Sequence, residues 1–174
     1  MSPLISKTKF IAHTALYLAI AILLPIAFHA FGIAGRIFLP MHIPVLLAGF
    51  LIGPYSGLVV GLLAPVISHL LTGMPPTYAV PLMSVELPIY GFIAGLTYYK
   101  LNFNIYISLI ISMIIGRLFF GLSLYLLGMF IDLPYNIAEF FAIGGAVVTG
   151  IPGIIIQIIL IPILVTAIKR TKTK

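Results

Sequence analysis

Apolar runs long enough to cross a lipid bilayer follow one another along almost the whole chain, and this pattern limits the possible folds more than any other feature. Hydrophobic residues make up 62% of the 174 positions and charged residues 7%, whereas a soluble domain carries about a quarter charged residues. Too little polar surface remains to cover a globule in water. We therefore expect an integral membrane protein made of helices.

Six apolar segments are predicted to span the membrane, because a helix needs roughly 20 apolar residues to do so. The second and third are short, and the sequence GPYSG at residues 53–57 indicates a tight turn between them. One interrupted helix or a re-entrant pair is the alternative there. The first segment is longer than the apolar region of a signal peptide, so we expect it to be retained. The prediction is one domain, 1–174, folded as a compact bundle with spans at 10–31, 39–53, 56–71, 82–99, 105–129 and 140–168.

Basic residues predict the orientation of this bundle. Six spans place both termini on one side, together with every Lys and Arg except Arg36 and Arg117. Cytoplasmic segments carry such an excess, so both termini are predicted to be cytoplasmic. The net charge of +6 comes from residues that flank the apolar runs, so we expect contact with the lipid bilayer and no nucleic-acid partner.

Four polar residues on four different spans are predicted to lie at one depth in the membrane: His42, Glu86, Arg117 and Gln157. Counted from the cytoplasmic ends of their spans, their depths agree within roughly 3 Å. Polar groups inside a bilayer usually face the bundle interior, so a shared polar cavity is one interpretation. The alternatives are a structural Glu86–Arg117 pair, a satisfied interior histidine and a simple interhelical hydrogen bond from Gln157.

The external loop TGMPPTYAVP, residues 72–81, is predicted to cover this cavity as a short lid. Its three prolines and Gly73 exclude a helix interior, yet it carries apolar and aromatic side chains such as Tyr78. A stiff connector lying in the membrane interface is the alternative. Asn136, in the last external loop, is a further candidate for closing the same mouth.

The run LPMHIPVLLAGFLIGPYSGLVVGLLAPVISHLLTGMPP, followed by MSVELPIYGFIAG, resembles the substrate-binding S components of energy-coupling factor (ECF) vitamin transporters. The resemblance implies a six-helix protein of a prokaryotic plasma membrane that binds a small vitamin from outside. It implies partners, namely a transmembrane coupling protein and two ATPases that use ATP, and no cofactor in this chain. Met41 and Tyr90 lie within the resembling motifs and join the predicted substrate site.

Small residues on the first span are the predicted docking surface for the coupling protein. The family uses an Ala-x-x-x-Ala pattern there, and Ala15 and Ala19 supply it in this chain. Independently, two alanines four residues apart lie on one helix face and permit close helix approach. An internal packing seam is the alternative.

The sequence PMHIP raises a hypothesis about His42. Pro40 and Pro44 are expected to prevent regular helix hydrogen bonding at the start of the second span and to hold His42 towards the site. The simpler alternative makes Pro40 a helix N-terminal residue and Pro44 a mild kink.

Other function classes find little support. The chain has no cysteine, no HExxH, GxSxG or Walker A motif, and only three acidic residues, so we expect no enzyme and no metal site. A hydrolase built on a Ser–His dyad from Ser68, Ser84 or His69 and a channel or scaffold subunit are the alternatives. For the ligand, a vitamin B6 form fits if Glu86 contacts it, and pantothenate fits if Arg117 is free of Glu86.

Overall fold

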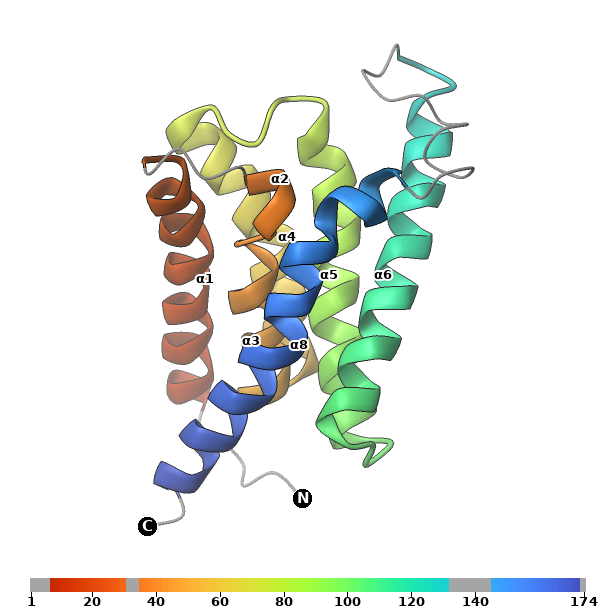
Figure 1. Ribbon diagram of the computed structural model, residues 1–174. Coiled ribbons are helices and arrows are strands. Elements are labelled where there is room, and N and C mark those ends of the chain that lie inside the picture. Colours follow the sequence, from red (N-terminus) through yellow and green to blue (C-terminus); the bar gives the residue numbers. More distant parts are fainter. Residues whose placement is uncertain (1–6, 31–34, 132–144, 173–174) are drawn as a thin grey trace.

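Helices make up all the regular structure of residues 7–30, 35–131 and 145–172, which are the residues that this computed structural model describes. Two short helices, α2 (Gly35–Phe38) and α3 (His42–Leu51), follow the first long one. Together the helices form a bundle (Figure 1). Those long and apolar enough to cross a membrane are α1 (Lys7–Ala30), α4 (Pro54–Thr72), α5 (Ala79–Tyr99), α6 (Ile105–Leu127) and α8 (Gly145–Lys172).

The short helix α3 differs most from the span expected over residues 39–53. Its 10 residues are all buried, and they rise about 15 Å, half of a typical hydrocarbon core. The one-turn helix α2 precedes α3, so the chain runs along the middle of the bundle in two pieces (Figure 1). Five long helices have the length to span a membrane, and a sixth crossing by α2 and α3 together stays a prediction.

Neither proline of the PMHIP sequence interrupts α3. The amides of His42 and Ile43 donate to the carbonyl oxygens of Leu39 and Pro40, at 3.1 and 3.3 Å, so a turn leads directly into the helix. Pro44 is the third residue of α3, where an N–H group would have no intrahelical acceptor in any case. The expectation that both prolines prevent regular helix hydrogen bonding is therefore wrong for Pro44, and His42 is the first residue of a regular helix.

Glycines hold α3, α4 and α5 unusually close together. A methyl group on Gly91 of α5 would lie 2.6 Å from backbone atoms of Gly57 on α4, and one on Gly95 would lie 2.6 Å from Pro54. Gly49 of α3 faces the backbone of Gly91 in the same way. Gly57-x-x-x-Gly61 and Gly91-x-x-x-Gly95 are small-residue patterns typical of helix contacts in membranes, and the expectations drawn from the sequence did not include them. These three helices form the tightly packed centre against which the others lie.

The loop between α4 and α5 is shorter than predicted. Residues 79–81 form the first turn of α5, so only residues 73–78 connect the two helices. Gly73 ends α4 in a left-handed conformation, with φ of 72°, which glycine adopts without a steric cost. The Nδ1–H of His69 donates to the carbonyl oxygen of Pro75 at 2.7 Å, because a carbonyl can only accept. The loop is thus held to the end of α4, while its action as a lid stays a prediction.

The opposite end of the bundle carries the basic residues. The start of α1, the connection from α5 to α6 and the end of α8 lie together there (Figure 1). This end carries Lys7, Lys100 and Arg170. It also carries Lys169, whose ammonium group donates a hydrogen bond to the Tyr98 hydroxyl at 2.8 Å. The charge asymmetry expected from the sequence is therefore also an asymmetry of the folded bundle.

Candidate functional site

A buried polar cluster lies where α3, α5 and α6 meet. His42 begins α3, Glu86 lies in the second turn of α5, and Arg117 lies in the middle of α6. The side chains of His42 and Glu86 are each 3% exposed and that of Arg117 is 14% exposed. Three of the four residues expected at one depth are therefore in contact inside the bundle.

The Glu86 carboxylate occupies the centre of this cluster. Arg117 Nη1 lies 3.0 Å from Glu86 Oε1, which makes a buried ion pair, although its angles are not those of a hydrogen bond. On the other side, His42 Nε2 lies 3.8 Å from Glu86 Oε2, an electrostatic contact that is longer than a hydrogen bond. Glu86 and Arg117 therefore pair with each other, as the structural alternative raised by the sequence expects.

Tyr90 packs beside the same three residues. It lies one helical turn after Glu86 on the same face of α5, and its ring meets the ring of His42 edge-on, with centroids 5.0 Å apart. A methyl group on Gly116 would collide with the Tyr90 ring, so this glycine leaves the space for it. Sequence reasoning placed Tyr90 at the site through its motif but missed Gly116, which precedes Arg117 on α6.

Several nitrogen atoms of the buried polar residues have no hydrogen-bond partner among the described residues. They are Nε and Nη2 of Arg117, both ring nitrogens of His42 and Nε2 of Gln157. A buried donor without a partner costs free energy, and native structures leave few of them. Such groups concentrated on three helices are typical of a place where a polar ligand completes the hydrogen bonding.

The remaining predicted site residues lie at different distances from the cluster. Met41 is buried next to His42 in the turn before α3. Gln157 is buried in α8, 1% exposed, and no ion pair or hydrogen bond joins it to the cluster within the described part of the chain. Tyr78 precedes α5, about 12 Å along the helix axis from Glu86. Asn136 lies outside the described residues.

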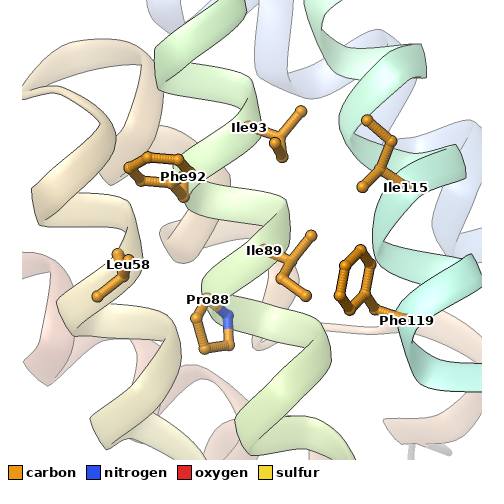
Figure 2. Close-up of a pocket in the computed structure, with 7 residues that line it drawn as sticks. All are labelled: Leu58, Pro88, Ile89, Phe92, Ile93, Ile115 and Phe119. Atoms are coloured by element: carbon orange, nitrogen blue, oxygen red, sulfur yellow. The ribbon is translucent and has the colours of Figure 1, made fainter. Parts of the chain in front are cut away.

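An apolar groove on the far side of α5 does not belong to this cluster. It has a volume of about 170 Å³, and its walls come from α4, α5 and α6. Pro88 and Phe92 come two and six residues after Glu86 on α5, which places them on a different face of the helix. Figure 2 shows Phe119 of α6 opposite Ile89. A groove with only apolar walls suits lipid chains and offers nothing to a water-soluble ligand.

Ala15 and Ala19 are both exposed on the outer face of α1. Thr14 and Tyr17 are buried on the opposite face, where the Thr14 hydroxyl lies 2.9 Å from the hydroxyl of Ser56 on α4. The alternative of an internal packing seam between the two alanines and another helix of this chain is therefore not what the structure shows. The surface is available to another molecule.

Comparison with known proteins gives the family. Residues 9–165, nearly the whole chain, match the family model described as ECF transporter, substrate-specific component. Neither a curated protein nor a solved structure matches the chain. The match extends over the helices that carry His42, Glu86, Arg117 and Gln157. The chain therefore belongs to the substrate-specific components of ECF transporters, the membrane-embedded subunits that bind the substrate and act together with a coupling protein and ATPases.

Proposed function

We propose that this protein captures a small water-soluble vitamin at the buried cluster of His42, Glu86, Arg117 and Tyr90, with Gln157 of α8 as a further polar contact. A vitamin B6 form and pantothenate are the two candidates that the sequence suggests. The observation that supports the proposal is the set of buried nitrogen atoms without a partner among the described residues on α3, α6 and α8. A polar ligand held there would satisfy groups that the described part of the chain leaves unsatisfied.

Delivery into the cell requires partners in this proposal. The chain contains no Walker A motif, and concentrating a solute needs an energy source. A transmembrane coupling protein and two ATPases would supply it, docking on the exposed face of α1 that carries Ala15 and Ala19. Small side chains permit a partner helix to approach closely in the membrane, where packing drives association.

The orientation completes the proposal. The end of the bundle that carries Lys7, Lys100 and Arg170 faces the cytoplasm of a prokaryotic cell, following the excess of basic residues on that side. The loop at residues 73–78 and the start of α3 then face outwards. A vitamin would enter from the outer side, past Tyr78, to reach Glu86.

Calorimetric titration of the purified protein in lipid nanodiscs tests the proposal. The ligands are pyridoxine, pyridoxal, pantothenate, riboflavin, thiamine, biotin and nicotinate, each added to protein shown to be folded by circular dichroism. Binding of one member at a ratio of one per chain is expected. A folded protein that binds none of them would contradict the vitamin proposal.

A further inference from the structure

We infer that the ligand carries a carboxylate, which binds side-on to the unpartnered edge of the Arg117 guanidinium. The inference rests on the proposed function and narrows it to one chemical class, small carboxylic acids. It separates the two candidates suggested by the sequence, because pantothenate is a carboxylate and pyridoxine is not.

The Arg117 guanidinium contacts the carboxylate of Glu86 and the hydroxyl of Tyr90, and two of its nitrogen atoms remain without a partner among the described residues. Nη1 makes the ion pair at 3.0 Å, while Nε and Nη2 are buried without a partner among the described residues. Nε–H and one N–H of Nη2 point in the same direction along one side of the planar group, so they can donate two parallel hydrogen bonds. A carboxylate has two oxygens with matching spacing, so it is the group that best satisfies both donors at once.

The negative charge of Glu86 is already balanced within the cluster by the positive charge of Arg117. The two oxygens of Glu86 already contact Arg117 on one side and His42 on the other. A cationic ligand that took the place of Arg117 at Glu86 would leave the guanidinium buried without a counter-charge. Among the described residues, Arg117 and Gln157 together leave three nitrogen atoms with N–H donors unsatisfied, against one carboxylate oxygen, Oε1 of Glu86, so the balance favours a ligand with more acceptors than donors.

Gly150 of α8 puts no side chain beside the open edge. A methyl group on Gly150 would lie 3.3 Å from Arg117 Nη2 and 3.3 Å from Leu39 Cδ1. An acceptor oxygen in a charge-assisted hydrogen bond lies about 2.7–2.9 Å from its nitrogen, so a methyl group there would compete with the ligand for this space. Gly150 is therefore assigned as a residue that admits the carboxylate.

Gln157 lies on the same face of α8 as Gly150, because seven residues make almost two helical turns. Its buried Nε2 is then about 10 Å along the axis from the open edge of Arg117. A ligand with a carboxylate at one end and an amide or hydroxyl oxygen towards the other would meet both donors. This adds length and a second acceptor to the description of the ligand.

Acid and alcohol pairs that differ in one group test the inference by calorimetric titration in nanodiscs. Pantothenate is compared with pantothenol, and 4-pyridoxate with pyridoxine. In whichever of the two pairs binds, the acid is expected to bind at least about tenfold more tightly than the alcohol, which corresponds to about 1.4 kcal/mol. An alcohol that binds as tightly as its acid would overturn the inference and leave the vitamin proposal standing, whereas no binding to any vitamin would contradict the vitamin proposal itself.

Two variants test the assignment to Arg117. Arg117→Lys keeps a cation for Glu86 but lacks the side-on fork, so the preference for the acid should fall at least about tenfold. Gly150→Ala should weaken binding of the acid, because the added methyl group occupies the space beside Nη2. This variant gives an independent answer if Arg117→Lys does not fold. Leu118→Ala, on the exposed face of α6, is the matched control with unchanged affinity. An unchanged preference in both folded variants would remove Arg117 from the inference.

Discussion

Replacing the charges of Glu86 and Arg117 by amides, one at a time and together, separates their structural role from ligand binding. Each single change leaves the other charge buried beside an uncharged amide. Removing one partner of a buried ion pair typically costs about 3–5 kcal/mol of folding free energy. The two should differ: a carboxylate left alone can become neutral by binding a proton, whereas a guanidinium cannot lose one. The loss of folding free energy is thus expected near about 5 kcal/mol for Glu86→Gln and near about 3 kcal/mol for Arg117→Gln.

The double variant Glu86→Gln with Arg117→Gln should recover most of this stability. Both charges are gone, and Gln side chains fill similar volumes with groups that can hydrogen-bond to each other across the present 3.0 Å contact. Replacing a whole buried pair is often neutral, so we expect the free energy of unfolding to lie within about 1 kcal/mol of the parent. Its affinity for the vitamin should nevertheless fall at least about tenfold, or about 1.4 kcal/mol.

Unfolding in mixed lipid and detergent micelles, followed by circular dichroism, gives the stabilities, and calorimetric titration gives the affinities. The four proteins form a double-mutant cycle, whose coupling energy reports the pair directly. Single variants as stable as the parent would refute the argument that the pair is buried and coupled. A stable double variant with parental affinity would remove both residues from the site and leave His42 and Gln157 as its polar groups.

Three further predictions concern other parts of the bundle. Changing Ala15 and Ala19 to Leu should leave vitamin binding intact but abolish complex formation with the coupling protein and uptake into cells, with Ala27→Leu as a control on α1; normal assembly would exclude this face. Gly91→Ala should lower the free energy of unfolding by about 1–3 kcal/mol, because the added methyl group overpacks against α4. An unchanged melting temperature would show that the helices separate easily. His69→Ala should speed hydrogen exchange in the loop at residues 73–78, whereas unchanged exchange would show that its hydrogen bond does not hold the loop.

Some features of the site followed from the sequence because they depend on one helix at a time. The depth of a residue along its helix is set by its position in the chain, so the sequence was enough to match Glu86 with Arg117. Which way each side chain points around its helix depends on packing. The structure therefore brings His42 to Glu86, while Gln157, which was expected at a similar depth, lies about 10 Å further along α8 and makes no ion pair or hydrogen bond with them among the described residues.

The sequence alone determined that this protein is helical and embedded in a membrane, because hydropathy adds up over neighbouring residues and needs no tertiary contact. It also determined where basic residues flank the apolar runs. Only the tertiary structure decided that α3 is short and wholly buried, that Gly57 and Gly91 bring two backbones into contact, and that one edge of Arg117 is left open. These features depend on the tilt and rotation of several helices relative to one another. A short stretch of sequence does not contain that information.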